Sequence, residues 1–173
     1  MDIPTLETDR LRLRAPELRD FAPYLAMWAD ERVTTFIGGT PRARDDSWRR
    51  FIGIHGLWAL MGFGYWIFAD RLNDRLIGVG GLASFERGVP ELDGFPESGW
   101  ALTADDWGQG YASEAMHAVL AWADAALPHD ETRCIIGPGN HASVGVATKL
   151  GYRHIGQNAD AIGAVDIFAR ARG

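Results

Sequence analysis

Two glycines separated by one residue stand where a strand-like run ending at Thr103 meets an alanine-rich helical run, in the hexapeptide Trp107-Gly108-Gln109-Gly110-Tyr111-Ala112. Small residues at positions 108, 110 and 112 would let backbone N–H groups at a helix N-terminus approach a pyrophosphate. A tight strand-to-helix turn without a ligand explains the same letters equally well, because short glycine patterns are weak signals. The hexapeptide lacks the Gly-Lys-Ser/Thr of a Walker loop, and Ser113 stands where a dinucleotide fingerprint would have its third glycine.

A second polar helix entrance follows further along the chain. Residues 139–152 place Asn140 and Ser143 at the start of another predicted helix, directly after its own strand. Asn140 can simply cap that helix. Two such entrances in tandem would nevertheless frame one long anionic ligand that carries an amide-bearing arm.

The elements around these entrances follow from hydrophobic periodicity and turn residues. Strict alternation predicts a strand over residues 10–14, and helical spacing from Phe21 to Trp28 predicts a helix that Asp20 caps and whose first turn holds Pro23. We expect a second helix to open at Thr40-Pro41 with Trp48, Phe51 and Ile52 facing inward.

The remaining chain alternates strands and helices. The pattern predicts a hairpin of strands 65–70 and 75–82 turning at Asn73-Asp74, then a Gly/Pro-rich loop 84–96, a strand 97–103, a helix 110–126, a strand 132–137, a helix 141–151, and a closing hairpin of 152–157 with 164–171. The sum is a mixed α/β fold, with residues 1–173 expected to form one domain.

Composition narrows the classes of function. The formal net charge of -6 argues against general nucleic-acid binding and is compatible with a cationic substrate such as an amine. The lone Cys134, in a strand-like context, excludes an intrachain disulfide and suits a reducing compartment, so we expect a cytoplasmic protein. The first residues lack the apolar stretch of a signal peptide, and the nearly uncharged residues 52–69 contain a Gly62-Phe63-Gly64 break that favours core over a membrane span.

Taken together, three ordered segments resemble the GNAT superfamily of acyl-CoA-dependent N-acetyltransferases, in its ribosomal-protein-alanine acetyltransferase-like (RimJ/RimL-like) branch. The segments are residues 6–33, 97–116 and 140–152, so the resemblance covers nearly the whole chain. It implies an α/β GNAT fold: a mixed, mostly antiparallel, twisted sheet of about seven strands flanked by about four helices. The sheet would be splayed between the strand at 97–103 and the strand at 132–137. It also implies acetyl-CoA as cosubstrate, and a homodimer is compatible with it.

The resemblance assigns a cofactor site residue by residue. The family's loop reads Gln or Arg, two variable residues, Gly, a variable residue, then Gly or Ala; Trp107 departs from the first place, while Gly110 and Ala112 match the last two. The backbone amides of Gly108, Gln109, Gly110, Tyr111 and Ala112 would hold the pyrophosphate. The strand around Ala101 and Leu102 would pair with the pantetheine amides, Asn140 would bond the pantetheine arm, and Ser143 would lie near the thiol.

The catalytic residues implied are fewer. Many superfamily members have a Tyr four residues after the position of Ser143 to protonate the leaving thiolate, but Ala147 stands there, so Ser143 or a water would act instead. A protonated amine must lose a proton before it attacks a thioester. We expect Glu97 to be the base through a water, although an isolated carboxylate at a strand end is often only solvated.

Other titratable residues are weaker candidates. Glu91 and Asp93 could serve as alternative bases, whereas Asp105 and Asp106 fit better beside the positive end of the helix. His117 is expected to be packed or exposed, and the five histidines show no metal-ligand spacing, so no metal is expected.

The main hypothesis is acetyl transfer to a primary amine in a ternary complex. A non-catalytic acyl-CoA sensor or interaction module on the same fold, and an unrelated nucleotide-binding domain, are the alternatives. The acceptor stays open among a protein N-terminus, a polyamine, an aminoglycoside and a small amine. Loop 84–96 and the region 30–40 are expected to line its side, where acids would suit a cation: Asp30, Glu31, Glu86, Glu91 and Asp93.

Overall fold

A twisted sheet runs through the molecule and carries both helix entrances. In the computed structural model, which describes residues 2–159 and 163–173, the sheet has eight strands in the order β1-β2-β3-β4-β5-β6-β8-β7. The strands are β1 (Leu6–Glu7), β2 (Leu11–Arg14), β3 (Tyr65–Asp70), β4 (Leu76–Ala83), β5 (Glu97–Leu102), β6 (Glu131–Ile136), β7 (Arg153–Asn158) and β8 (Val165–Ala171). All neighbouring pairs are antiparallel except β5 and β6, so the expected mixed, mostly antiparallel sheet of an α/β fold is confirmed, with β1 as an additional short edge strand.

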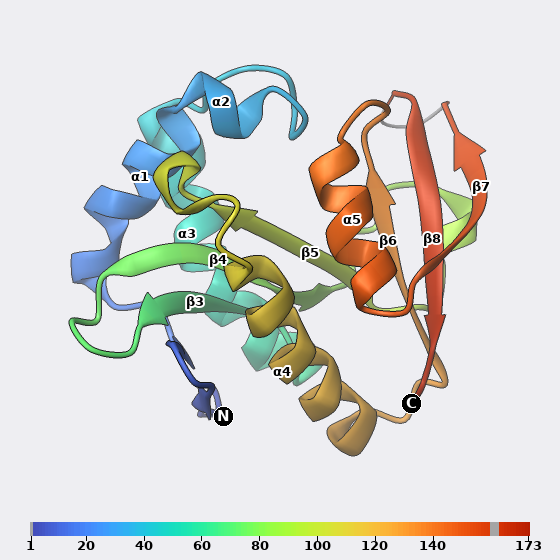
Figure 1. Cartoon of the computed structure of the whole chain (residues 1–173), viewed down its shortest axis with the longest axis horizontal. Coiled ribbons are helices and arrows are strands. Elements are labelled where there is room, and N and C mark those ends of the chain that lie inside the picture. Colours follow the sequence, from blue (N-terminus) through green and yellow to red (C-terminus); the bar gives the residue numbers. More distant parts are fainter. Residues whose placement is uncertain (1, 160–162) are drawn as a thin grey trace.

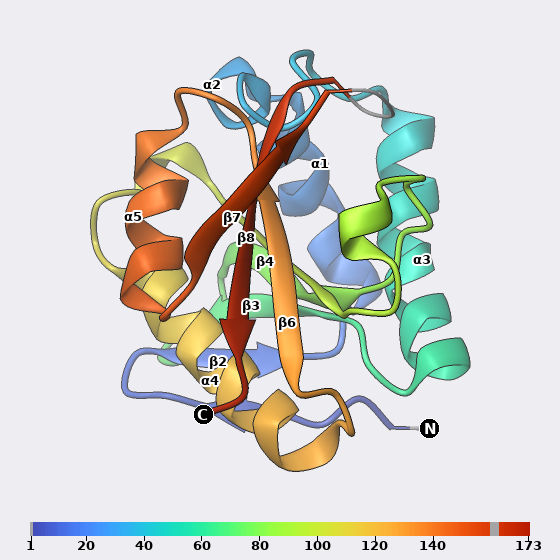
Figure 2. The ribbon, with the colours of Figure 1, turned by 90° about the vertical axis from the view of Figure 1, so that its right-hand side faces the viewer.

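Helices cover both faces of this sheet. They are α1 (Phe21–Ala29), α2 (Glu31–Thr34), α3 (Arg44–Met61), α4 (Tyr111–Ala126) and α5 (His141–Lys149), with short 3-10 turns at Leu18–Asp20, Pro90–Leu92 and Ala104–Asp106. Figure 2 shows α4 and α5 on one side of the sheet, and α1, α3 and the segment between β4 and β5 on the other. The two faces of the sheet therefore carry different features. The face with α4 and α5 carries the two helix entrances, and the face with α1 and α3 carries the loop between β4 and β5.

The helix after the glycine turn packs as its sequence predicts. Its apolar stripe of Ala115, Met116, Val119, Leu120 and Ala123 is buried against the sheet. Spacing of three and four residues places these side chains on one face, and burial of that face stabilises the helix more than intrinsic propensity does. The start of α4 is consequently held in a fixed position relative to the end of β5.

The sheet opens between β5 and β6. These strands are parallel and share a single register pair, Glu97 with Arg133, after which they diverge (Figure 1). The predicted splay is confirmed, and it leaves the β6-facing edge of β5 beyond Glu97 without a strand partner among the described residues. An unpaired strand edge offers N–H and C=O groups to any extended, amide-containing ligand.

Two predictions about α1 and α3 need correction. Asp20 stands at the N-cap position of α1 as predicted, but its side chain does not bond the helix, because its buried carboxylate accepts two hydrogen bonds from Arg14, at 2.7 and 2.9 Å. The second helix begins at Arg44 rather than at Thr40-Pro41, since the preceding residues are extended and the Arg42 N–H bonds the Trp28 carbonyl at 2.9 Å.

The inward face of α3 also differs from the expectation. Its buried residues are Ser47, Phe51, Ile54 and Trp58, which follow a spacing of four, three and four. Trp48 and Ile52 lie about 100° further round the helix from Ser47 and Phe51 and are exposed. The break in residues 52–69 is confirmed, because α3 ends at Met61 and β3 begins at Tyr65. Nowhere in residues 2–159 and 163–173 is there a helix long and apolar enough to cross a bilayer.

Candidate active site

The glycine turn forms a bare helix entrance. Gly108 has φ +76°, and Gly110, which immediately precedes the first residue of α4, has φ +83°. Both values lie in the left-handed region, which residues with a Cβ enter at a cost, so glycine is required for the backbone path itself. No side chain caps the first turn of α4.

The amide groups of this turn are left without partners. Across the described chain, no residue accepts a hydrogen bond from the backbone N–H of Gly108, Gln109, Gly110, Tyr111 or Ala112. Unsatisfied N–H groups at the positive end of a sixteen-residue helix make a favourable site for an anion. The predicted pyrophosphate turn thus has the donors that this role requires.

Neighbouring side chains shape the turn without covering its amides. Glu114 lies in the first turn of α4, and its carboxylate accepts one hydrogen bond of 2.6 Å from the Thr8 hydroxyl and one of 2.6 Å from Arg10. Arg10 also donates to the Gln109 carbonyl at 3.0 Å and lies over the Tyr111 ring. The Arg10 charge therefore sits beside the amides, where it would favour a negatively charged ligand.

An ion pair anchors the turn to the rest of the sheet. Asp106 accepts two hydrogen bonds of 2.8 Å from Arg75 and one from Thr103, and the Arg75 hydrogen bond lowers the pKa of the Asp106 carboxyl. The Trp107 indole N–H donates to the Leu102 carbonyl at 3.1 Å. Asp106 therefore fixes the loop to the β3–β4 hairpin rather than compensating the helix dipole directly, as we had expected.

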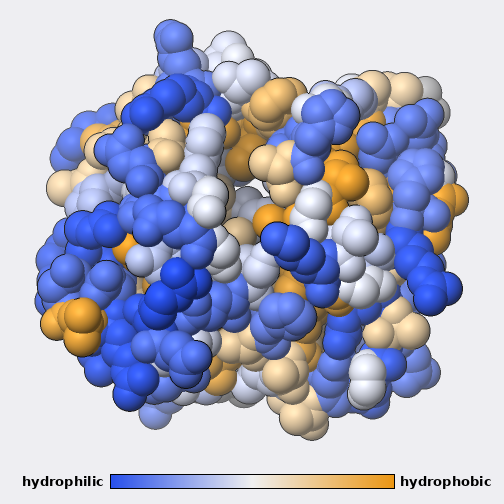
Figure 3. Space-filling view, viewed as in Figure 1, coloured by the Kyte–Doolittle hydropathy of each residue, from blue (hydrophilic) through white to orange (hydrophobic). Residues whose placement is uncertain are grey.

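The predicted pantetheine strand lies beside this turn. Ala101 and Leu102, at the end of β5, are buried and register with Val79 and Gly78 of β4. Their other edge faces the gap that opens between β5 and β6. Figure 3 shows the surface hollowed between the side that carries α1 and α2 and the side that carries α5. The turn, the open strand edge and the hollow are thus contiguous.

The second entrance is built differently from the first. The Asn140 side-chain oxygen accepts the Ser143 N–H at 3.1 Å, so Asn140 caps α5. Its side-chain NH₂ group is still available to a ligand. Ser143 is half-buried and its hydroxyl bonds no residue of the described segments, whereas Ala147 is fully buried.

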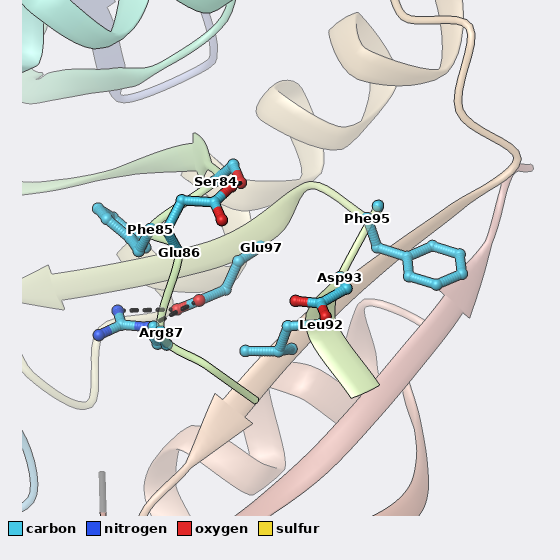
Figure 4. A pocket seen from close by; sticks show the side chains of 9 residues that line it. Ser84, Phe85, Glu86, Arg87, Leu92, Asp93, Phe95 and Glu97 are labelled. Carbon is cyan, nitrogen blue, oxygen red and sulfur yellow. Dashed lines mark hydrogen bonds and ion pairs between the residues drawn. The ribbon is translucent and has the colours of Figure 1, made fainter. Parts of the chain in front are cut away.

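Glu97 is buried at the start of β5 and held by an arginine. Its side chain is only 6% exposed, and Arg87 donates to both carboxylate oxygens, at 2.8 and 3.0 Å (Figure 4). A carboxylate has about four acceptor positions, so this bidentate pair leaves room for a water on each oxygen. A buried glutamate with two remaining acceptor positions can take a proton through a water.

A pocket of about 220 Å³ opens above this ion pair. Glu86 and Asp93 also line this pocket, and in Figure 4 the Glu86 carboxylate lies beside Ser84, whose hydroxyl donates a hydrogen bond to it at 3.2 Å. The remaining lining comes from the loop between β4 and β5: Ser84, Phe85, Arg87, Leu92, Gly94 and Phe95. The expectation that loop 84–96 surrounds a site is consistent with this arrangement, and Glu97 forms the inner wall.

Two residues of this site were missed by sequence reasoning. Arg87 carries no signal in the sequence, because nothing in loop 84–96 indicates that its arginine returns to the strand that follows. The Tyr65 hydroxyl lies over Gly99, where a Cβ would overlap it, and burial followed by the negative charge of Glu97 raises the pKa of Tyr65. Gly99, in the middle of a strand, was the available hint, since such glycines mark a close approach.

The other titratable residues lie elsewhere. His117 and Asp105 are exposed, and the Glu91 carbonyl accepts a hydrogen bond from Arg133. Burial raises the pKa of Cys134, which makes it an unreactive thiol. Within the described segments, no three His, Cys, Asp or Glu side chains are grouped as a metal site.

Comparison with known families adds a direct match. A family profile described as "Acetyltransferase (GNAT) domain" matches residues 10–153. The uncharacterized protein YkkB of Bacillus subtilis (strain 168) is 30% identical over 155 residues, covering 86% of this chain and 85% of its own length.

Solved structures agree in fold. An acetyltransferase from Agrobacterium tumefaciens strain C58 has a TM-score of 0.83 and 28% identity, covering 98% of this chain and 95% of that one. RimL, a ribosomal L7/L12 alpha-N-protein acetyltransferase solved with coenzyme A, has a TM-score of 0.78 over 97% of this chain and 98% of its own, at 15% identity. The latter similarity concerns the fold alone.

Proposed function

The chain belongs to the GNAT family of acetyltransferases, and on this premise we propose that it transfers an acetyl group from acetyl-CoA to a primary amine by direct attack in a ternary complex. The observation that carries the proposal is the α4 entrance, whose five consecutive backbone amides have no acceptor in the described chain. Acetyl-CoA combines a pyrophosphate with an amide-bearing arm, which matches those amides and the open edge of β5.

In this proposal the cosubstrate spans both entrances. Gly108 to Ala112 bind the pyrophosphate with their backbone N–H groups, so the Trp107 side chain itself contributes little. Ala101 and Leu102 pair with the pantetheine amides as an added strand would, and the Asn140 NH₂ group bonds the same arm. Ser143 then lies near the sulfur.

Proton movement is assigned to two residues. Glu97 takes the amine proton through a water, the amine nitrogen attacks the thioester carbonyl, and a backbone N–H of β5 stabilises the oxyanion. The new C–N bond is thus complete before the intermediate collapses; the C–S bond then breaks, the nitrogen releases its second proton to water, and the departing thiolate receives a hydrogen bond or proton from Ser143 or a water. A serine hydroxyl is a poor acid, so hydrogen bonding is its main contribution.

The base is tested by Glu97→Gln, which keeps the size of the side chain and removes its basicity. We expect CoA affinity to stay unchanged and kcat to fall about 100-fold, since loss of a general base typically costs at least that factor. Glu91→Gln, on the same loop but outside the pocket, should behave like the wild type. Unchanged kinetics of Glu97→Gln would remove Glu97 from the role.

A non-catalytic acyl-CoA sensor is the second candidate function. Two observations favour it: Ala147 replaces the tyrosine acid, and both oxygens of Glu97 already accept from Arg87. A broad panel of amines separates the two functions, because a sensor would bind acetyl-CoA and acetylate none of them.

The finer assignment is also a proposal. The RimJ/RimL-like branch is supported by the sequence resemblance and by the fold shared with RimL, which acts on a ribosomal protein N-terminus. We further propose that residues 1–173 work as one domain in the cytoplasm, where a single buried cysteine suits the reducing conditions.

A further inference from the structure

The Tyr65 hydroxyl reaches from β3 to β5 across the strand between them. In the register of the sheet, Gly81 of β4 lies opposite both Tyr65 of β3 and Gly99 of β5. A Cβ added at Gly99 would overlap the Tyr65 hydroxyl oxygen and come 3.3 Å from the ring carbon that bears it. The tyrosine ring therefore crosses β4 and ends at β5, a close approach that glycines inside strands allow.

This hydroxyl lies on the same face of β5 as the Glu97 side chain. Glu97 and Gly99 pair regularly with β4, and residues two apart on a strand point to the same face. Ser98, between them, points to the opposite face, where its hydroxyl bonds the Tyr152 hydroxyl. The Tyr65 hydroxyl thus takes the place of a side chain at position 99, roughly 6.6 Å along the strand from position 97.

A series of side-chain contacts places Tyr65 at the wall of the Glu97 pocket. Its ring packs edge-on against the Phe85 ring, with 5.9 Å between the ring centres. Phe85 lines the pocket together with Arg87 and Glu97, and the Arg87 guanidinium lies 4.5 Å from the centre of the Phe85 ring (Figure 4). Arg87 in turn donates to both oxygens of Glu97. Each step from Tyr65 to the carboxylate is therefore a direct contact between neighbouring side chains.

The Tyr65 hydroxyl has no hydrogen-bond partner in the parts of the chain that the structure describes. Burial, followed by the negative charge of Glu97, raises the pKa of Tyr65, so the phenol keeps its proton at neutral pH. A neutral phenol can donate, whereas the Glu97 carboxylate only accepts and has one position left on each oxygen. Two hydrogen bonds of about 2.8 Å through one water span about 5.6 Å, close to the separation of these two positions on the strand.

We propose that Tyr65 is a positioning residue for acetyl transfer: its hydroxyl and the Glu97 carboxylate hold between them the water that relays the amine proton. The inference rests on the proposed function and names the residue that fixes the relay. The water accepts a hydrogen bond from Tyr65 and donates one to Glu97, which leaves its second lone pair for the acceptor. The protonated amine gives its proton to that lone pair and the water passes one of its own to Glu97, so water and phenol are left unchanged.

Tyr65→Phe tests this role, because it removes the hydroxyl and keeps the ring that packs on Phe85. We expect kcat to fall about 3- to 10-fold, the worth of one neutral hydrogen bond, with the KM for acetyl-CoA unchanged. In the Glu97→Gln background the same substitution should have no further effect, because no base is left for the water to serve. An unchanged kcat, or equal fold-changes in the two backgrounds, would overturn the proposal.

Tyr152→Phe is the matched control, because it removes a tyrosine hydroxyl from the opposite face of β5. That hydroxyl bonds Ser98 and, at 2.8 Å, Thr132, so its loss should lower the midpoint of thermal unfolding. We expect kcat to stay at the wild-type value. A loss of kcat equal to that of Tyr65→Phe would trace both effects to a disturbed strand and overturn the role of the water.

A structure determination keeps the inference independent of turnover. In crystals of the wild-type protein with CoA, we expect a water within about 3.2 Å of both the Tyr65 hydroxyl and a Glu97 oxygen, and its loss in Tyr65→Phe. If no amine is acetylated but this water is found and is lost in the variant, the transferase function fails and the water site stands. If amines are acetylated and the water is missing, or is bound equally in the variant, the water site fails and the transferase function stands.

Discussion

The two helix entrances of the molecule look alike in sequence and differ in chemistry. At the start of α5, the Asn140 side chain satisfies the Ser143 N–H at 3.1 Å, so the chain caps its own helix. At the start of α4, glycines in left-handed conformation stand where a cap would be, and five amides have no partner in the described segments. A helix end that its own chain leaves uncapped, on a turn anchored by Asp106, leaves its N–H groups open to an anion, which is the role proposed for it.

Substituting the glycine of the bare entrance should have the largest effect. Gly110→Val forces a β-branched residue into φ +83°, displaces the amides, and should weaken CoA binding about 100-fold, equivalent to losing two charge-assisted hydrogen bonds. Gly151→Val is the matched control, because Gly151 has φ +89° but follows the end of α5. Both variants should lose stability, and only the first should lose affinity in calorimetric titration. Equal affinity losses would show that backbone strain, not the entrance, is responsible.

The Asp106–Arg75 ion pair that anchors the α4 entrance should make the stability of the fold sensitive to acid. The pKa of the Asp106 carboxyl is lower in the folded protein than in the unfolded chain. The ionised carboxylate therefore stabilises the fold fully at a pH above the unfolded-state pKa, and this stabilisation is lost as the pH falls through the folded-state pKa. We expect Asp106→Asn to reduce the free energy of unfolding by about 1–2 kcal/mol at pH 7, a figure discounted because Arg75 is half exposed. In urea unfolding, this difference from the wild type should shrink below about pH 4. A difference that stays constant with pH would contradict the ion pair.

The capped entrance should give the smallest effect. Asn140→Ala removes the cap and should cost about 1 kcal/mol of stability, whereas Asn140→Asp keeps the acceptor and should not. Thermal unfolding measures this difference. If the Asn140 NH₂ group also binds pantetheine, both variants weaken CoA binding; if Asn140 is only a cap, the Asp variant binds CoA like the wild type.

The sequence predicts single helices and strands better than it predicts side-chain contacts between different elements. The apolar stripe of residues 115–123 predicts the helix that follows the turn, because that face of α4 is buried against the sheet. Asp20 was assigned to the helix beside it, but a buried guanidinium at Arg14 attracts its carboxylate more strongly than a helix N-terminus does.

In the candidate site too, the contacts between residues of different elements could not be predicted from the sequence. Glu97 was a candidate from its place at a strand start, yet its pairing with Arg87 depends on how the intervening loop folds back. Arg42 falls within the helix that was expected to open at Thr40-Pro41, yet it precedes α3 and its N–H bonds the Trp28 carbonyl of α1 at 2.9 Å. Such contacts between elements leave no periodic pattern in the sequence.

The central claim is that the α4 entrance binds the pyrophosphate of acetyl-CoA. Calorimetric titration of the wild-type protein with CoA and with pantetheine, which shares the amide arm but lacks the pyrophosphate, tests it most directly. The account predicts that CoA binds at least ~100-fold more tightly than pantetheine, because several amide-to-phosphate hydrogen bonds are lost with the pyrophosphate. Equal affinities for the two compounds, or no binding of CoA at millimolar concentration, would contradict it.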